Sequence, residues 1–446
     1  MKAKQNILFI LLSMLFSTAK AQKDSVGQRH EFSLQQCVEY AQKNNAQLKN
    51  TILDLRIQEQ DNKAITAQAL PAVNGSGNIT DYVKIPTTLL PGEFFGEPGK
   101  YIPVTFGTKY NATASVTLRQ IIFDGQVFVG LQARKTSIDY YQKNIDITNE
   151  TIKANIYKVY YQLVVSKTQI EQLNANIERL QNLLHVTSEL YKNGFAEKID
   201  VDRTNVQLAN LQTEKSGVVN SINNGYLGLK LLLGMPEQDT LILTDEITEG
   251  EVKQGLLNDG YQYNDRNDFQ LLQLGKKLNE YNIKRYKLSA LPTLSFDAAY
   301  TKQAQRTKFD IFGPGNWFTT SYVGLNLSVP IFNGLSKAAT IEKSKLQLQQ
   351  TQNQIEALKI SIDNDVKQAI NNFQTAISNL DYQKQNMQLA EQVYNQAQKK
   401  YEAGTGAQID ITNAQTDLRV AQSNYTNALY NAIIAKVDYL KATGKL

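Results

Sequence analysis

One stretch of the chain, from Leu335 to Ala403, runs for close to seventy residues without a glycine or a proline. Its apolar residues recur every seven positions, a spacing typical of a helix that supercoils on its neighbours. The larger members of this row are Val366, Phe373, Leu380, Met387, Tyr394 and Tyr401. At 1.5 Å per residue, an unbroken helix of this size would be roughly 100 Å long, which exceeds an ordinary globular domain. The stretch therefore predicts an elongated, mainly helical molecule.

The chain contains an internal duplication at an offset of about 210 residues. A tyrosine followed three residues later by glycine occurs at Tyr191 and again at Tyr401, and an Ile-Asp pair follows at Ile199 and at Ile409. The seven-residue row obeys the same offset, with Ile156, Leu163, Ile170, Ile177, Leu184 and Tyr191 in the first copy. Two copies of one structural unit are the simplest interpretation.

Each copy predicts a helix, a strand, a loop, a second strand, the long helix and a return helix. The first copy spans 22–234, with strands at about 70–83 and 109–124 around a loop at 84–108, and with its long helix at about 126–193. The second copy spans 257–446, with strands at about 291–302 and 318–333 and its long helix at about 335–403. Residues 235–256 form a linker (an equatorial segment) with extended character at 241–244.

The helix lengths constrain the arrangement within each copy. A return helix, at 196–233 or 407–443, is about half as long as the long helix that precedes it. The first helix of each copy, expected at 33–67 with Ser33 as N-cap and at 265–287, supplies the missing length. We therefore expect the first and return helices to stack end to end.

The N-terminus predicts a signal peptide at 1–21, with a lysine-containing start, an apolar core of about ten residues and an Ala-Lys-Ala cleavage site. No later segment reaches the roughly eighteen apolar residues that a membrane-spanning helix needs. A membrane crossing would therefore require β-strands closed into a barrel. The strands near 112–118 and 323–331 alternate apolar and polar residues, which suits a strand between lipid and water but also a soluble sheet.

The number of strands then predicts the assembly. Four strands per chain cannot close a membrane barrel, and eight leave an interior filled with side chains. Three chains give twelve strands and an open lumen. The predicted fold is therefore mainly α with membrane β: a homotrimeric 12-stranded β-barrel in membrane lipid, continued by an α-helical barrel.

Several functional classes are excluded by what the sequence lacks. The formal charge of +5 falls to about +2 without the signal peptide, and no basic run accompanies it, so no nucleic-acid partner is expected. His30 and His185 are too few for a metal site. No phosphate-binding loop or nucleophile motif occurs, so we expect neither an enzyme nor a cofactor. The single cysteine, Cys37, is interpreted as a packing residue.

Together these motifs resemble the TolC family of outer-membrane efflux proteins. The resemblance rests on Leu70-Pro71 and Leu291-Pro292 at the strand starts, on Pro330-Ile-Phe-Asn-Gly334 before the long helix, and on the doubled Tyr-x-x-Gly and Ile-Asp motifs. It covers essentially the whole chain after the signal peptide. It implies a trimeric channel-tunnel through the outer membrane and periplasm, with a periplasmic adaptor protein and an inner-membrane pump as partners.

The resemblance also implies a closed entrance at the periplasmic tip of the second hairpin. Asp410 matches the first position of a constricting carboxylate ring, and Asn413 stands where the second acid is found in the family. Tyr401 and Asp200 match residues whose hydrogen bond links neighbouring hairpins, whereas Gly406 replaces the arginine that assists that link. A structural alternative for Asp410 is a carboxylate favoured by the N-terminal end of the helix dipole.

The predicted function is passive export of small molecules, such as drugs and toxic compounds, as the outer component of a tripartite efflux pump. Two alternatives remain. The first is an exit duct for type I secretion of peptides or proteins. The second is an exported coiled-coil structural or adaptor protein, which would bury its alternating strands in a soluble sheet and need no detergent for extraction.

Overall fold

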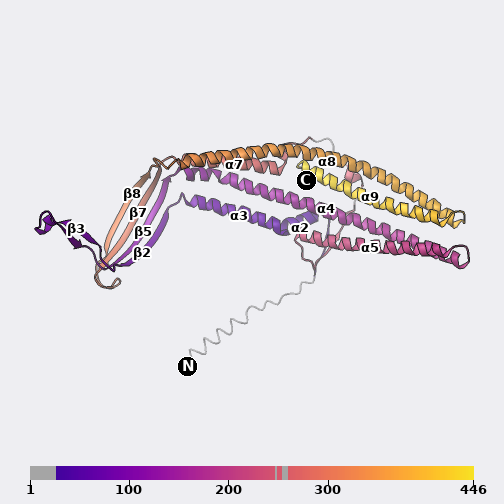
Figure 1. Cartoon of the computed structure of the whole chain (residues 1–446), viewed down its shortest axis with the longest axis horizontal. Helices are drawn as coiled ribbons and strands as arrows, with labels where there is room; N and C mark the ends of the chain where they lie inside the picture. Colours follow the sequence, from indigo (N-terminus) through magenta and orange to yellow (C-terminus); the bar gives the residue numbers. More distant parts are fainter. Residues whose placement is uncertain (1–26, 247–248, 254–259) are drawn as a thin grey trace, which may run out of the picture. The chain divides into compact units, whose positions relative to one another are not determined.

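The computed structural model describes residues 27–246, 249–253 and 260–446 (Figure 1). The signal peptide predicted at 1–21 lies outside the described residues. The chain divides into two compact units, which we treat separately. The helical unit consists of the described parts of Met1–Asn50, Ile147–Arg266 and Ile362–Leu446, and the sheet unit consists of Thr51–Asp146 and Asn267–Ser361.

The sheet unit contains a four-stranded antiparallel sheet with one strand pair from each copy. The strand order is β2-β5-β7-β8. The strands are β2 (Ala72–Asp81), β5 (Tyr110–Phe123), β7 (Thr293–Arg306) and β8 (Phe318–Ser328). β8 ends five residues before the predicted position 333, because Pro330 has no backbone N–H to donate to a strand ladder.

A second, two-stranded antiparallel sheet lies where a loop was expected at 84–108. β3 (Thr87–Pro91) pairs with β4 (Tyr101–Thr105) around a 3-10 turn, η1 (Gly92–Phe95). The loop prediction was wrong here. It relied on the proline and glycine content of the segment, which does not prevent a strand ladder from forming. Pro91 and Pro103 are tolerated since both strands of a two-stranded ribbon have a free edge.

Two long helices pass through both units, as the heptad rows predicted. They are α4 (Gly125–Lys192) and α8 (Ser336–Glu402). The apolar row of α8 is largely buried, with Val366, Phe373, Leu380 and Tyr394 each at most 3% exposed. Burial of this row within the helical unit is the main hydrophobic contribution to holding the helices together.

The first helix of copy one is broken, whereas a single helix was predicted over 33–67. Ser33 caps α2 (Leu34–Asn44) as expected, in a capping box with Gln36. The chain then leaves the helical conformation at Asn45 and resumes as α3 (Ala46–Ala67). The Asn45 side chain donates to the Leu232 carbonyl (2.7 Å) and accepts from the Leu48 amide (3.1 Å), so tertiary contacts stabilise the break.

The end of the return helix of copy one lies at this break. The return helix α5 (Lys198–Leu233) ends at Gly234, which has a φ of 70°. A Cβ at this glycine would lie 2.5 Å from the Asn44 carbonyl oxygen. Copy two repeats the arrangement: α9 (Gln408–Ala442) is followed by Gly444, whose Cβ would lie 2.5 Å from the Asp265 carbonyl oxygen, just before α7 (Asn267–Leu288). Glycine is therefore required at both helix junctions.

The linker between the copies lies against the helical unit. Its extended segment, β6 (Thr240–Leu243), pairs in parallel with β1 (Arg29–Phe32), a strand that the sequence did not predict. A short helix, α6 (Glu249–Lys253), follows. Glu249 accepts hydrogen bonds from Tyr425 (2.6 Å) and Lys384 (2.8 Å), and Lys253 pairs with Asp381. The linker thereby connects the start of copy one to the α8–α9 hairpin.

Two further observations concern the described helices. None of them is long and apolar enough to cross a membrane. Cys37 is fully buried on α2, in agreement with its interpretation as a packing residue.

Candidate functional site: the two faces of the sheet and the hairpin tips

The register of the four-stranded sheet sorts its residues onto two chemically different faces. Because successive side chains of a strand point to opposite sides, residues paired across strands share a face. A row on the first face joins Val73, Leu118, Ala298 and Val323. A row on the second face joins Ser76, Ser115, Thr301 and Thr320. The alternation of apolar and polar residues predicted within single strands is therefore in register from strand to strand across the sheet.

The apolar face of the sheet is open within one chain. Its pairs Phe296–Leu325 and Leu294–Leu327 extend the apolar rows toward the ends of the strands that adjoin the long helices. Leu325 is 69% exposed and Val323 is 75% exposed. An exposed apolar surface of this kind marks a site of contact with lipid or with another molecule.

The second face is hydrophilic. Besides its hydroxyl row, in which the Ser76 and Ser115 oxygens lie 2.7 Å apart, it places Arg119 3.8 Å from Asp297. These groups retain their hydration only if this face meets water. The two faces of the sheet are therefore suited to different environments, one apolar and one aqueous.

The two outer strands of this sheet each have one free edge. Among the described residues, β2 pairs only with β5 and β8 pairs only with β7. A long free edge exposes unpaired N–H and C=O groups, which favour pairing with another chain. The sheet is thus incomplete in a single chain.

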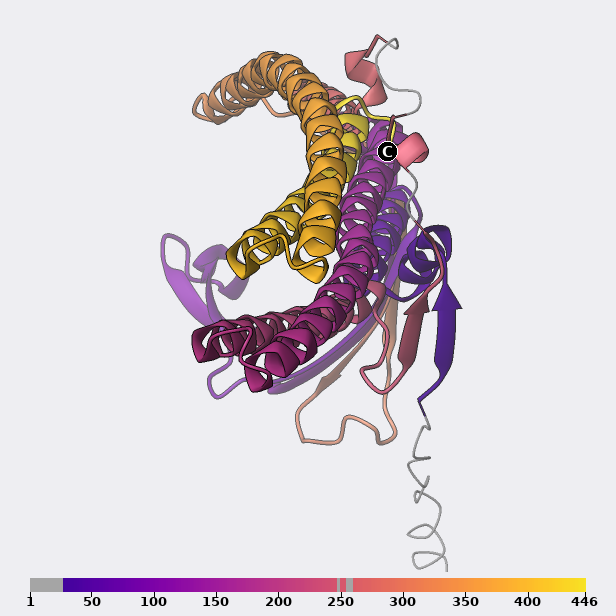
Figure 2. The ribbon, with the colours of Figure 1, turned by 90° about the vertical axis from the view of Figure 1, so that its right-hand side faces the viewer.

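The hairpins of the helical unit end in two similar tips, seen end-on in Figure 2. Gly194 and Gly404 adopt positive φ in the two turns. Asp200 and Asp410 then occupy the first turns of α5 and α9, where a carboxylate is stabilised by the helix dipole. Asp410 is exposed, as is Asn413 three residues later on the same side of the helix.

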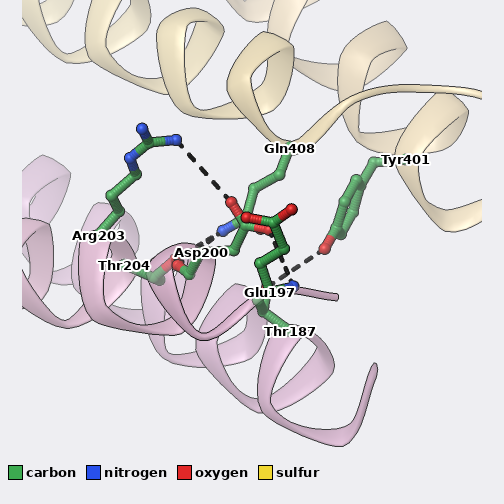
Figure 3. A network of polar contacts seen from close by, with 7 residues as sticks. All are labelled: Thr187, Glu197, Asp200, Arg203, Thr204, Tyr401 and Gln408. Atoms are coloured by element: carbon green, nitrogen blue, oxygen red, sulfur yellow. Dashed lines mark hydrogen bonds and ion pairs between the residues drawn. The ribbon is translucent and has the colours of Figure 1, made fainter. Parts of the chain in front are cut away.

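A network of polar contacts joins the two tips (Figure 3). The Gln408 amide donates to the Asp200 backbone carbonyl (2.9 Å) and to the Thr204 hydroxyl (3.0 Å). The Tyr401 hydroxyl lies 3.3 Å from that of Thr187, which is fully buried. Each of these contacts connects the first hairpin to the second, so the tips of one chain are held together.

The structure places Asp200 and Tyr401 in this network without bonding them to each other. The Asp200 carboxylate accepts from the Glu197 amide (3.4 Å) and lies 3.9 Å from Arg203. Among the hydrogen bonds of the described residues, none joins Tyr401 to Asp200. A bond between these two residues on neighbouring chains remains a prediction, as do the gate positions Asp410 and Asn413.

Sequence reasoning missed Gln408 and Thr187. Thr187 is a hydroxyl in a helix row whose counterpart in the second copy is Ala397, and Gln408 stands where the first copy has Lys198. The sequence signal for both residues was therefore a difference between the two copies at matching positions. A buried hydroxyl in an otherwise apolar row needs a hydrogen-bond partner.

The local backbone explains why no arginine occupies position 406. A Cβ at Gly406 would lie 3.0 Å from the Tyr401 backbone nitrogen and 3.0 Å from the Lys400 Cβ. The Gly406 amide also donates to the Lys400 carbonyl (3.0 Å), which holds the turn against the helix end. A larger residue here would need these neighbours to shift by a few tenths of an ångström, so the tight turn favours glycine.

Further along the same hairpins, amide and ionic contacts continue the connection. Arg419 pairs with Glu214 at 2.9 Å, and Asn176 donates to Gln422 at 2.8 Å. No group of three or more His, Cys, Asp or Glu side chains in the described part of the chain could hold a metal ion.

Comparison with protein families finds a match to the model described as "Outer membrane efflux protein" over residues 264–445. Outer membrane efflux protein BepC of Brucella suis biovar 1 (strain 1330) is 24% identical over 341 residues, which cover 74% of this chain and 67% of BepC. Outer membrane protein TolC of Escherichia coli (strain K12) is 23% identical over 282 residues, which cover 60% of this chain and 56% of TolC.

Solved structures share the fold along nearly the whole chain. The outer membrane protein VceC of Vibrio cholerae superposes with a TM-score of 0.72 at 16% identity, covering 92% of this chain and 96% of VceC. CusC superposes with a TM-score of 0.75 at 13% identity, covering 93% and 92%. At these identities the likeness concerns the fold alone.

Proposed function

Because this chain belongs to the TolC family of outer membrane efflux proteins, we propose that it is a passive channel in the outer membrane that exports small molecules. The observation that carries the proposal is the aligned apolar and hydrophilic faces of the four-stranded sheet. A sheet with these faces is suited to lie between lipid and a water-filled lumen.

The free strand edges support a homotrimer. Pairing β2 of one chain with β8 of the next would be antiparallel, as are all neighbouring pairs within the sheet. Three chains would then close a ring of twelve strands with no remaining edge, wide enough for a lumen. The long helices α4 and α8 would continue this lumen into the periplasm as a tunnel.

We further propose that the hairpin tips form the periplasmic entrance. Three copies of Asp410 around one axis would attract cations and would repel one another. The entrance would conduct few ions until the tips move apart. The carboxylate of Asp200 and the hydroxyl of Tyr401 would supply contacts between neighbouring hairpins. Asn413 would line the next level of the entrance without a charge.

The proposed channel does not drive transport by itself. Its family consists of channel proteins rather than enzymes, and the sequence contains no nucleotide-binding motif. Export against a gradient would therefore need an inner-membrane pump, joined to the tips through a periplasmic adaptor protein. Such a tripartite assembly would expel drugs or toxic compounds delivered by the pump.

A second candidate function is the outer-membrane step of type I secretion. It is favoured by a relative, Proteases secretion protein PrtF of Dickeya chrysanthemi, which is 19% identical over 257 residues. The substrate of a passive duct is determined by its pump, so the two candidates share one channel. Export of a labelled small molecule from cells carrying the channel, compared with secretion of a co-expressed polypeptide, would distinguish them.

The channel proposal is tested by purification from outer membranes. We expect a trimer that requires detergent and that conducts ions after reconstitution into planar lipid bilayers. A chain that extracts into buffer as a monomer would contradict the proposal and favour a soluble structural or adaptor protein. A detergent-dependent trimer without conductance would contradict the open lumen but would still support a location in the membrane.

A further inference from the structure

The β3–β4 hairpin presents an apolar surface that nothing in its own chain covers. Phe94 is 79% exposed, Tyr101 is 71% exposed and Leu89 is 62% exposed. Leu89 and Tyr101 lie on one face of the ribbon, because Leu89 pairs with Pro103 and Pro91 pairs with Tyr101. An ordered ribbon with exposed aromatic side chains indicates an interaction surface.

This hairpin is a prolongation of the strand pair β2–β5. Asp81 is paired with Tyr110, and the next ladder starts with Thr87 paired with Thr105. Between these pairs the connecting segments are nearly equal, 82–86 on one side and 106–109 on the other. β3 therefore follows β2 in the same ribbon, and Figure 1 shows this hairpin turning away beyond the end of the four-stranded sheet. Since β2 is an outer strand, the segment that connects it to the hairpin starts at a free edge of the sheet.

The opposite outer strand, β8, is preceded at the same end of the sheet by the β7–β8 loop, residues 307–317. This loop is anchored to its own sheet: Ile311 is buried with Ala112 and Ala304, and the Phe309 ring packs edge-on to Tyr110 at 5.5 Å. These contacts leave Phe312 projecting, 91% exposed. The loop, which leads directly into the outer strand β8, is therefore held against β5 and β7 and presents an exposed aromatic side chain at this end of the sheet.

We propose that the β3–β4 hairpin of one chain docks on the β7–β8 loop of the next chain, forming an apolar collar around the outer end of the barrel. The inference rests on the proposed trimer, in which β2 pairs with β8 of the neighbour. That pairing brings the continuation of β2 to the segment that precedes β8. Leu89, Phe94 and Tyr101 would then bury Phe312 and cover Trp317 of the neighbouring chain. Because the strand pairing of the proposed trimer joins these two segments of neighbouring chains, the occupant is a second copy of this chain.

Cysteine cross-linking tests the contact directly. The chain has a single cysteine, Cys37, which is fully buried and will not compete for reagent. We would prepare Tyr101→Cys, Phe312→Cys and the double variant in full-length protein, and treat detergent-solubilised trimers with a short bis-maleimide. The double variant should form covalent dimers and trimers on denaturing gels, because each chain contributes one residue to each of two contacts. Neither single variant should do so.

The alternative outcomes separate this inference from the trimer itself. An intact trimer whose double variant stays uncross-linked, or links only within one chain, overturns the docking proposal. Dimers from Tyr101→Cys alone would show that hairpins meet each other and would also overturn it. If light scattering finds no trimer in detergent, the proposed channel fails together with the collar.

The sole tryptophan provides a second measurement without cross-linking. Trp317 lies at the end of the β7–β8 loop and is 38% exposed in a single chain. Replacing Phe94 and Tyr101 with serine should shift its emission to longer wavelength and increase acrylamide quenching in the trimer. The matched control is Tyr382→Ser, at an exposed tyrosine of α8. Unchanged quenching in the hairpin variant, with the trimer retained, would overturn the proposal.

Discussion

At the scale of single residues, the duplication distinguishes positions that look identical in sequence. Asp200 and Asp410 occupy matching first-turn positions. Asp200 is bound to the Glu197 amide and near Arg203, whereas Asp410 is exposed. The carboxylate of Asp200 has a role in its own helix cap, whereas the carboxylate of Asp410 is exposed to solvent.

Replacing Asp410 with alanine should therefore change conduction more than stability. With three carboxylates removed from the proposed axis, single-channel conductance in planar bilayers should rise and the preference for cations should fall. Asp200→Ala removes an acceptor of its own helix cap and is expected to lower the free energy of unfolding by about 1 kcal/mol, so it is the comparison for stability rather than for selectivity. An unchanged cation preference in Asp410→Ala would remove this residue from the gate.

The packing around Cys37 changes the acidity of its thiol. Burial, and secondarily the charge of Asp245, raises its thiol pKa from 9.0 to about 12. Since the unfolded chain loses this proton first, the contribution of the protonated thiol is fully present below pH 9 and declines as the pH rises toward 12. The free energy of unfolding should include a loss of about 1.4 kcal/mol per pH unit in that window.

Denaturant unfolding of wild type and Cys37→Ala at several values between pH 8 and pH 11 measures this contribution. Other groups titrate in both proteins, so the difference between the two slopes isolates Cys37. Parallel slopes would show that the thiol ionises as readily in the folded protein as in the unfolded chain.

At the scale of elements, the junctions between helices depend on few residues. α2 and α3 meet at Asn45, where the end of α5 also arrives. Helix propensity alone favours a continuous helix through this segment, because no proline or glycine occurs between Ser33 and Ala67. The break exists because the Asn45 side chain bonds two elements at once.

Asn45→Ala should therefore destabilise the helical unit although alanine is the better helix former. The change leaves the Leu232 carbonyl and the Leu48 amide without their partner, at a cost of about 1–3 kcal/mol. Circular dichroism during denaturation measures it. Asn50→Ala, at an exposed position of α3, is the control and should be neutral or slightly stabilising. Equal midpoints for both variants would mean that the junction does not depend on Asn45.

At the scale of the whole molecule, the two faces of the sheet would meet different environments in the proposed trimer, lipid on one side and water on the other. Adjacent positions of β8 face opposite sides: Leu325 pairs with Phe296 on the apolar face, and Asn326 pairs with Ser295 on the other. The same substitution at these two positions therefore tests which face meets lipid.

Leu325→Lys should reduce assembled trimer in outer membranes, because a lysine on the lipid face costs about 2–4 kcal/mol at the bilayer centre. Asn326→Lys should assemble normally and lower the cation preference of the channel, since it adds positive charge to the lumen. Quantitative blotting of membrane fractions and bilayer recordings provide the two readouts. Equal assembly of both variants would contradict a lipid-facing apolar side.

The sequence alone determined the features that arise from periodicity along the chain. The heptad rows predicted α4 and α8, the alternation predicted the four strands, and the offset of the motifs predicted two copies. These patterns are local and recur many times along the chain, so each recurrence supports the same assignment of helix, strand or copy.

Only the tertiary structure decided what depends on contacts between distant segments. The break at Asn45 is stabilised by the carbonyl of Leu232, the pairing of β1 requires β6, and the tip network joins Gln408 to Asp200 and Thr204. The β3–β4 ribbon forms despite its prolines because it prolongs a strand pair already in register. None of these contacts has a period along the chain; each arises from side chains that folding brings together.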